Sequence, residues 1–202
     1  MIRVFSAGIR RIPHWEAFLE KEQTQFADSE VVVGWGHKPT AAKARSYAKA
    51  KHLPYVSLED GFLRSLDLGV KGAAPLSLTV DPVGVYYDAT GPSQIETDIR
   101  EAQTWLTPEV RDRARRYLDR IVACDLSKYN AAPSVARGWL EATYPGCRGK
   151  EKILLIDQTR GDASVTLGLA DESSFRRMAA DARAEHPGAA FFVKTHPDVV
   201  AG

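Results

Sequence analysis

The feature that most constrains the fold of this chain is the alternation of short β-type runs with segments of helical periodicity. Strands that alternate with helices are typical of a parallel sheet flanked by helices, so the sequence predicts an α/β fold. One run, Ile153–Ile156, is continuously apolar, as expected of a strand buried on both faces. The strand candidates are Ile2–Ser6, Glu30–Val33, Tyr55–Leu58, Leu76–Val80, Val83–Tyr87, Ile153–Ile156 and Ala190–Val193.

Three of the intervening segments carry helix signals. Thr40–His52 is rich in Ala and Lys and has only a thin apolar side. The strongest helix begins at Thr107 as its N-cap, with Pro108 in the first turn, and its apolar stripe follows the 3.6-residue spacing. Another begins at Asp171 and ends at His186-Pro187-Gly188. The apolar stripes are Val110, Ala114, Tyr117, Leu118, Ile121 and Val122 in the former, and Phe175, Met178, Ala179 and Ala182 in the latter.

A change of composition divides the chain. Residues 131–152 mix proline, glycine and charged residues, and we interpret them as a linker. It would join an N-terminal α/β lobe, residues 1–130, to the start of a C-terminal α/β lobe, residues 153–202. That second lobe holds only strand, loop, helix and strand, whereas a doubly wound domain has about five or six strands. We therefore expect it to be incomplete, either as a minimal lobe or as a piece of a longer protein.

Composition excludes several classes of function. Lys and Arg total 27 against 26 for Asp and Glu, so the net charge of +1 gives no basis for binding nucleic acid. Two cysteines support neither a disulfide framework nor a zinc site, and we expect no metal. The N-terminus has no signal-peptide pattern, and the apolar runs fall far short of the roughly 20 residues of a membrane span. We expect a cytoplasmic protein whose membrane contact, if any, is peripheral.

Residues suited to chemistry follow four of the expected strands, where ligands bind in open parallel sheets. After Val33 the chain reads Gly34-Trp35-Gly36-His37-Lys38 and runs into a helix. Glycines let backbone N–H groups approach an anion at a helix N-terminus, so Gly34, Gly36 and Lys38 are candidate ligand-binding residues. An ordinary tight turn between strand and helix explains the same residues.

Two adjacent carboxylates, Glu59 and Asp60, follow the next strand, with Arg64 close behind. Burial and mutual repulsion raise the pKa of one member of such a pair, which suits acid–base catalysis. The alternative is that Glu59 is solvated and Asp60 caps the following turn.

The run Asp157-Gln158-Thr159-Arg160-Gly161-Asp162 follows the expected strand Ile153–Ile156. It brings two carboxylates and an arginine across a glycine turn, although Asp162 is equally well explained as a turn or N-cap residue.

Lys194 and His196 follow the last strand, and a cation beside a histidine suits a phosphate leaving group. Pro197 would hold His196 in an extended conformation. A lone histidine here would more often be structural.

Assembled, these stretches resemble the capsule polysaccharide β-Kdo transferase family, specifically the first of the two modules that such proteins carry. The resemblance covers nearly the whole chain. The Glu-Asp-Gly and His-Pro motifs are also similar to those of bacterial sialyltransferases, which use a CMP-activated sugar too. The matching stretches are Gly8–His14, Trp35–Pro39, Leu58–Ser65, Pro75–Leu78, Tyr86–Ala89, Leu126–Asn130, Asp157–Asp162 and Lys194–Val199.

The resemblance implies two Rossmann-like lobes of the GT-B type, with residues 1–130 as the N-terminal lobe and residues 153–202 as the start of the C-terminal nucleotide-sugar-binding lobe. It also implies a retaining transfer of Kdo from CMP-β-Kdo, with no cofactor. The acceptor would be a lipid-linked Kdo chain at the inner face of the cytoplasmic membrane, and capsule export machinery would be a partner. Asp162 matches the family's nucleophile position, with Asp157 as the fallback, and Glu59 supported by Asp60 would be the acid/base. His196 would be catalytic and, with Lys194, would stabilise the charge that develops on the CMP phosphate. The implied substrate-binding residues are Lys194, Arg64, Arg160, Gln158, Asp157, Gly34, Gly36 and Lys38.

Two other functions fit the same residues. The chain could be a non-catalytic lobe that binds nucleotide or glycolipid as a scaffold for capsule export. It could also be a sialyltransferase-like enzyme that uses a different CMP-sugar.

Overall fold

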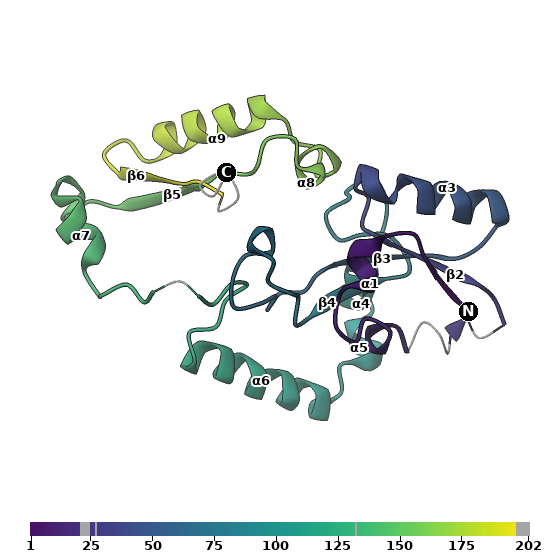
Figure 1. The fold of residues 1–202 in the computed structure, drawn as a ribbon. Coiled ribbons are helices and arrows are strands. Elements are labelled where there is room, and N and C mark those ends of the chain that lie inside the picture. The colour runs from purple at the N-terminus through teal and green to yellow at the C-terminus, as the bar shows by residue number, and fades with distance from the viewer. Residues whose placement is uncertain (21–24, 27, 132, 197–202) are drawn as a thin grey trace. The chain divides into compact units, whose positions relative to one another are not determined.

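The computed structural model describes residues 1–196 except 21–24, 27 and 132, and it divides into two compact units. Unit 1 is Met1–Ala132 and unit 2 is Pro133–Gly202. Each unit contains parallel strands with helices beside them (Figure 1), so the predicted α/β class is confirmed.

Unit 1 is built on a four-stranded sheet in the order β1-β2-β3-β4. Strands β1 (Ile2–Val4), β2 (Val31–Trp35) and β3 (Tyr55–Asp60) are parallel, with Val33 opposite Val56 in register. Strand β4 (Leu78–Asp81) pairs antiparallel with β3, so the parallel sheet that the sequence predicts ends in one antiparallel edge strand.

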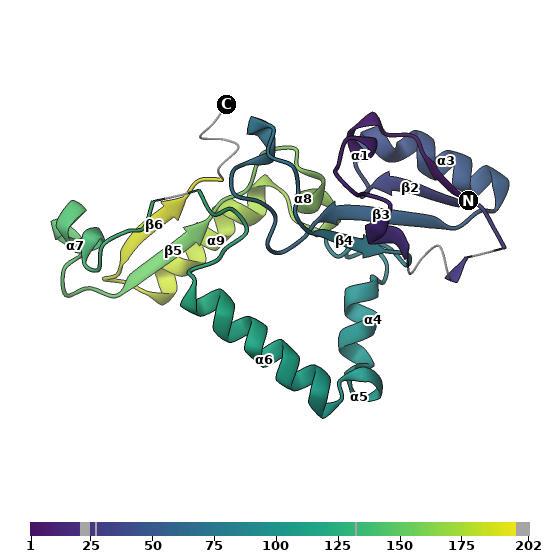
Figure 2. The ribbon, with the colours of Figure 1, turned by 60° about the horizontal axis from the view of Figure 1, so that its bottom comes forward.

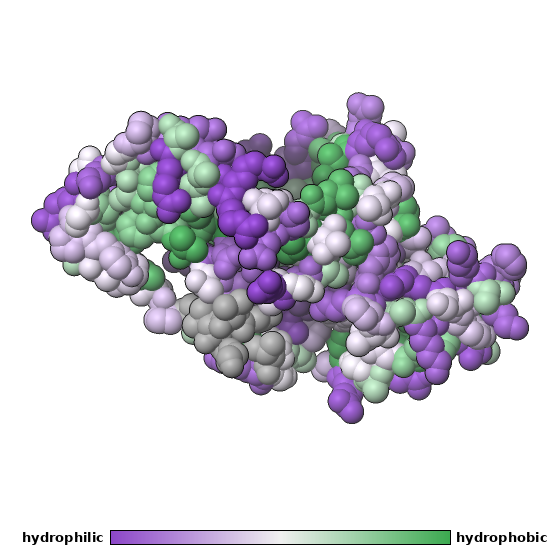
Figure 3. All heavy atoms as spheres, turned by 90° about the horizontal axis from the view of Figure 1, so that it is seen from above, coloured by the Kyte–Doolittle hydropathy of each residue, from purple (hydrophilic) through white to green (hydrophobic). Residues whose placement is uncertain are grey.

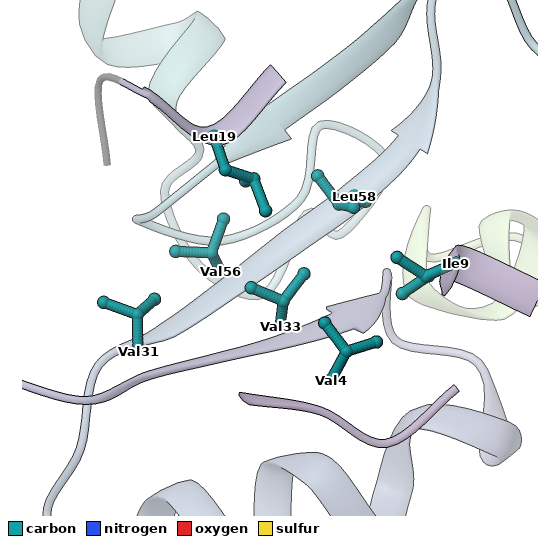
Figure 4. Close-up of a cluster of buried hydrophobic side chains, with 7 residues drawn as sticks. All are labelled: Val4, Ile9, Leu19, Val31, Val33, Val56 and Leu58. Carbon is teal, nitrogen blue, oxygen red and sulfur yellow. The ribbon is translucent and has the colours of Figure 1, made fainter. Parts of the chain in front are cut away.

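Apolar residues cover both faces of this sheet. On one face β1, β2 and β3 contribute to a cluster closed by α1 (Ala7–Arg10) and η1 (Ala17–Leu19), shown in Figure 4. On the other face η2 (Pro39–Ala41) leads into α3 (Ala42–Lys51), whose Ala44 and Ala48 pack on Val32. The thin apolar side of this helix is therefore sufficient, because small side chains let it lie close to the sheet. The buried members of the first cluster are Val4, Ile9, Leu19, Val31, Val33, Val56 and Leu58.

The expected strand Val83–Tyr87 is wrong, because Asp81 ends the sheet with a turn. The buried Asp81 carboxylate accepts the backbone N–H groups of Val83 at 2.9 Å and Gly84 at 2.7 Å. It also accepts the N–H of Gln94 at 3.1 Å, at the start of α4 (Gln94–Arg100). A carboxylate that binds the backbone locally competes with strand pairing, and here it closes residues 82–93 into a loop.

The helix predicted from Thr107 is confirmed as α6 (Pro108–Ala123). Along the chain it comes after η3 (Gly69–Lys71), α4 and α5 (Ala102–Trp105). The Thr107 side chain accepts the N–H of Val110, as an N-cap does. Its apolar stripe is not buried: Tyr117 is 62% exposed and Val122 75%, and Figure 2 shows α6 standing away from the strands of unit 1. No helix in the described ranges combines the length and the hydropathy of a membrane span, α6 included.

Unit 2 pairs β5 (Lys152–Ile156) in parallel with β6 (Ala190–Lys194), joined by α8 (Ala163–Leu167) and α9 (Glu172–Glu185). The predicted start of α9 is confirmed by a capping box between Asp171 and Ser174. Many apolar side chains of this unit stay exposed, among them Ile156 at 57%, and Figure 3 shows hydrophobic residues reaching the surface among hydrophilic ones.

The segment expected to be a linker packs with unit 2 instead. It holds α7 (Trp139–Thr143) and η4 (Pro145–Cys147). Tyr144, between them, packs edge-on against Phe192 of β6 with a ring-centroid distance of 5.6 Å. The aromatic contact attaches this stretch to β6, and Cys147 within it is buried.

Candidate active site

Predicted residues from strand ends, together with residues of nearby loops, form two clusters, one in each unit. The Glu59 cluster consists of Gly36, His37, Glu59, Tyr87 and Asp88 in unit 1. The His196 cluster consists of Asp157, Thr159, Asp162, Lys194 and His196 in unit 2.

Gly36 makes the turn that begins the Glu59 cluster. It follows β2 in the left-handed region, with φ of 47°, and its N–H donates to the Leu58 carbonyl at 2.9 Å. A Cβ at this position would lie 2.3 Å from both Glu59 Oε1 and Tyr87 Oη. Only glycine fits here, because any side chain would occupy the space of the carboxylate and the phenol.

Gly34 is also enclosed by the chain itself. A Cβ at this position would lie 2.3 Å from the hydroxyl of Tyr55, which donates to the Gly36 carbonyl at 2.9 Å. The two glycines predicted to approach a ligand thus give close approach to side chains of this chain, while Lys38 beyond them is exposed.

Glu59 is the buried acid of this cluster. It lies near the end of β3, is 7% exposed, and accepts a hydrogen bond from the Tyr87 hydroxyl at 3.0 Å. Burial raises the pKa of Glu59, and the charge of Lys38 and the Tyr87 hydrogen bond oppose that rise. A raised pKa makes this carboxyl a stronger proton acceptor than an ordinary glutamate, which suits acid–base catalysis.

Tyr87 is held from its other side by the loop after β2. Its oxygen accepts the backbone N–H of His37 at 3.1 Å, and burial raises the pKa of this phenol. The His37 ring in turn lies with Nδ1 2.7 Å from Asp88 Oδ2. The hydroxyl and N–H of Thr90 hold the other Asp88 oxygen and, with His37, lower the pKa of Asp88.

Sequence reasoning did not assign Tyr87, His37 or Asp88 to the site. The stretch Tyr86–Ala89 matched the family resemblance, but its apolar composition pointed to a strand. The signal that could have found it is Asp81, whose short polar side chain before Pro82 favours a turn.

Asp60 and Arg64 are used to hold the loop after β3. Asp60 Oδ1 lies 2.7 Å from Arg64 Nε, in an ion pair that is not well aligned for a hydrogen bond. Arg64 is 8% exposed and its Nη1 donates to Ser65 Oγ at 2.8 Å and to the Ala73 carbonyl at 2.9 Å. Within unit 1 this guanidinium is therefore committed to internal partners.

The same loop is pinned by the Ser127–Asn130 segment. The N–H groups of Arg64 and Ser65 both donate to the Lys128 carbonyl, and the Asn130 side chain donates to the Ser65 carbonyl at 3.2 Å. Two stretches of the resemblance, far apart in sequence, thus meet and fix the chain immediately after Glu59 and Asp60.

In unit 2 the ends of β5 and β6 bring their motifs together as predicted from adjacent parallel strands. The Asp157 N–H donates to the Lys194 carbonyl at 3.1 Å, and Thr159 Oγ1 lies 2.9 Å from His196 Nδ1. Lys194 and Gln158 are exposed. Pro197, expected to fix the backbone of His196, lies outside the described residues.

Asp162 caps α8. Its Oδ1 accepts the N–H of Ser164 at 2.8 Å, which is the N-cap role that the sequence left open beside the nucleophile role. Arg160 is 92% exposed on its side chain and lies 3.3 Å from Glu172. Over the described residues, no group of three or more His, Cys, Asp and Glu side chains is arranged to hold a metal ion.

A family model described as capsule polysaccharide biosynthesis protein matches residues 30–202. The chain belongs to this capsule polysaccharide biosynthesis family. Among curated relatives, the capsule polysaccharide modification protein LipA of Neisseria meningitidis serogroup A is 44% identical over 200 residues, which are 98% of this chain and 28% of LipA. The lipopolysaccharide-processing protein LpsZ of Rhizobium meliloti is 36% identical over 184 residues, covering 90% of this chain and 40% of LpsZ. The chain thus spans less than half the length of either relative.

Solved structures of the capsule family confirm the fold class. The β-Kdo 2,4 transferase of Thermosulfurimonas dismutans KpsC is similar over 100% of this chain and 62% of that chain, with a TM-score of 0.85 and 47% identity. The KpsC β-Kdo 2,7 transferase shares the fold over 89% of this chain, with a TM-score of 0.57 and 24% identity. The resemblance drawn from sequence motifs is confirmed by these matches.

Proposed function

We propose that this chain is the sugar-transferring module of a capsule polysaccharide glycosyltransferase that moves Kdo from CMP-β-Kdo to a lipid-linked Kdo acceptor. The observation that carries the proposal is the 47% identity and TM-score of 0.85 to a β-Kdo 2,4 transferase over the whole chain. The alternative roles as a scaffold or with another CMP-sugar have no such support. The acceptor would lie at the inner face of the cytoplasmic membrane and pass to the capsule export machinery.

The first step is attack on the donor. A carboxylate oxygen of Asp162 bonds to the anomeric carbon, and the bond from that carbon to the phosphate oxygen breaks, so CMP leaves with the electron pair. Lys194 and His196 stabilise the charge that develops on the phosphate. The hydrogen bond from Ser164 N–H fixes the Asp162 side chain, which favours a single direction of attack.

The second step transfers the sugar. The acceptor hydroxyl attacks the anomeric carbon, its proton passes to Glu59, and the bond to Asp162 breaks with return of the electron pair to the carboxylate. Two inversions give net retention, as in retaining glycosidases. The mechanism requires the Glu59 and His196 clusters to act on one sugar, and this requirement stays a prediction.

Substrate recognition is assigned by exposure and charge. Arg160, with its side chain 92% exposed, is better placed than the buried Arg64 to bind the Kdo carboxylate in bidentate fashion. Gln158 and Asp157, beside it in the loop after β5, are candidate partners for sugar hydroxyls. Lys38 lies beside Glu59 and adds positive charge where an anionic sugar would bind.

The test is transfer from CMP-β-Kdo to a synthetic Kdo-terminated glycolipid, followed by mass spectrometry. Asp162→Asn keeps an N-cap side chain, because Asn caps helices as well as Asp does, but it removes the nucleophile. We expect transfer to fall at least about 1,000-fold and the covalent sugar adduct to disappear.

The matched control is Asp171→Asn, which makes the same change at the N-cap of α9 and should leave transfer intact. Unchanged transfer in Asp162→Asn would remove Asp162 as the nucleophile. CMP binding without any transfer by the unaltered chain would favour the scaffold function.

A further inference from the structure

A connected set of hydrogen bonds leads from Asp88 through His37 and Tyr87 to Glu59. Its links are Asp88 to the His37 ring at 2.7 Å, His37 N–H to Tyr87 Oη at 3.1 Å, and Tyr87 Oη to Glu59 Oε1 at 3.0 Å. We infer that Tyr87 is a positioning residue for Glu59, held in place by the His37–Asp88 pair. Its use in catalysis rests on the proposed function, whereas the network itself does not.

The direction of the hydrogen bond to Glu59 is fixed by what Tyr87 accepts. A phenol has a single hydrogen, and the Tyr87 oxygen already accepts the His37 N–H. The hydrogen therefore points to Glu59 Oε1, which an ionised carboxylate accepts. Tyr87 thus stabilises the charged form of Glu59 and opposes the rise in pKa that burial causes.

The position of His37 is fixed by its ring and by its backbone. The lowered pKa of Asp88 keeps this carboxylate ionised and able only to accept, so Nδ1 of His37 carries the hydrogen of that contact. On the backbone side, the left-handed turn at Gly36 aims the following N–H at Tyr87. Two independent constraints hold the N–H that orients the phenol.

In this arrangement the two carboxyl oxygens of Glu59 have different roles. Oε1 is engaged by Tyr87, so a proton taken from an acceptor hydroxyl is handled by Oε2. The charged or titratable groups that act on the pKa of Glu59 are Lys38 from the loop after β2, Asp60 beside it on β3, and Tyr87. The charge of Glu59 in turn raises the pKa of Tyr55 on the same strand. Of these, Tyr87 is hydrogen-bonded to Glu59 Oε1 through its hydroxyl, and the raised pKa of Tyr87 keeps the proton on that hydroxyl.

The test follows the titration of Glu59 directly, by ¹³C NMR of its side-chain carboxyl in the 202-residue chain. The signal is assigned by its loss in Glu59→Gln. Tyr87→Phe keeps the ring and its packing but removes the hydroxyl. Since a hydrogen bond to a charged group contributes about 1.5–3 kcal/mol, we expect the Glu59 titration midpoint to rise by roughly one pH unit or more.

Tyr86→Phe is the matched control, because it removes a hydroxyl from the neighbouring tyrosine and keeps the edge-to-face ring contact with Tyr87. It should leave the Glu59 titration close to that of the unaltered chain. Asp88→Ala should move the midpoint in the same direction as Tyr87→Phe but by less, since it only loosens the His37 N–H. An unchanged titration in a folded Tyr87→Phe chain would overturn the inference.

Transfer assays separate this inference from the proposed function. If the chain transfers Kdo, the acid limb of its pH–rate profile should move upward in Tyr87→Phe together with the NMR midpoint. A shifted NMR midpoint without any transferase activity would support the positioning role of Tyr87 and would count against the proposed Kdo transfer. A shifted midpoint with an unmoved pH–rate profile would show that Glu59 is not the group that exchanges the proton, and would reject a catalytic use of Tyr87.

Discussion

Gly36→Ala is expected to be among the most damaging single substitutions in unit 1. The new Cβ would lie 2.3 Å from Glu59 Oε1 and from Tyr87 Oη. Both atoms would have to move away from the new Cβ, and this movement would disturb the 3.0 Å hydrogen bond that they form at a buried carboxyl. The left-handed backbone adds its own cost, because alanine at a φ of 47° is strained.

The magnitude follows from these two contributions. Left-handed backbone costs a non-glycine residue about 1–2 kcal/mol. Loss of a hydrogen bond to a charged or buried group costs about 1.5–3 kcal/mol. We therefore expect Gly36→Ala to lower the free energy of unfolding of unit 1 by about 3–5 kcal/mol.

Gly72→Ala provides the control that isolates the contact. Gly72 also has a positive φ, of 87°, but a Cβ there meets nothing within 4 Å. This variant should therefore lose only the backbone contribution of about 1–2 kcal/mol. Both are measured by urea-dependent hydrogen exchange of peptides from β2 and β3, which reports on unit 1 alone. Equal losses in the two variants would refute the claim that Glu59 and Tyr87 fill the space in front of Gly36.

Two further predictions concern the same unit. Asp81→Ala leaves the N–H groups of Val83, Gly84 and Gln94 without their carboxylate acceptor. The free energy of unfolding, measured in urea, should therefore fall by about 3–5 kcal/mol. A loss below about 1 kcal/mol would show that Asp81 does not hold the loop. Burial raises the pKa of Glu59 above its ordinary 4.5, so the folded chain binds that proton more tightly than the unfolded chain. The Glu59 contribution to stability therefore falls as the pH rises from 4.5 through the folded-state pKa. Glu59→Gln should gain stability relative to the unaltered chain as the pH rises over this range, and a difference that is constant with pH in urea titrations would contradict the buried, ionisable Glu59.

The strands of this fold could be predicted because most are short apolar runs, whether they are buried, as β2 and β3 are, or largely exposed, as β5 is. An apolar run does not indicate whether its strand is parallel or antiparallel to its neighbour, so the direction of β4 could not be predicted from its own sequence. A parallel partner for β3 would need a crossover of a dozen or more residues, usually with a helix, and residues 61–77 hold only η3. The length and content of the connection between β3 and β4 therefore predict the direction of β4 better than the sequence of β4 does. In place of a crossover helix, this connection contains the buried Arg64.

The site could be predicted where it lies at the ends of parallel strands. Glu59 and the Thr159–His196 pair come from such ends, and their placement follows from topology. Tyr87 and Asp88 come from a loop after an antiparallel edge strand, for which periodicity gives no rule. Their position depends on the Asp81 turn, a local hydrogen-bonding choice that outweighs the β propensity of a Val-Tyr-Tyr run.

The glycines after β2 lie against side chains of this chain. Their spacing suggested backbone approach to a phosphate, but their hydrogens face the side chains of Tyr55, Glu59 and Tyr87. The Gly-Trp-Gly-His stretch therefore acts on chemistry indirectly: the missing Cβ of Gly36 admits the carboxyl and the phenol, and the next N–H orients that phenol. It follows that the residues at positions 36, 59 and 87 depend on one another, because a side chain at position 36 would occupy the space of the Glu59 carboxyl and the Tyr87 phenol. Any chain that keeps this acid buried beside this tyrosine must keep glycine at the turn.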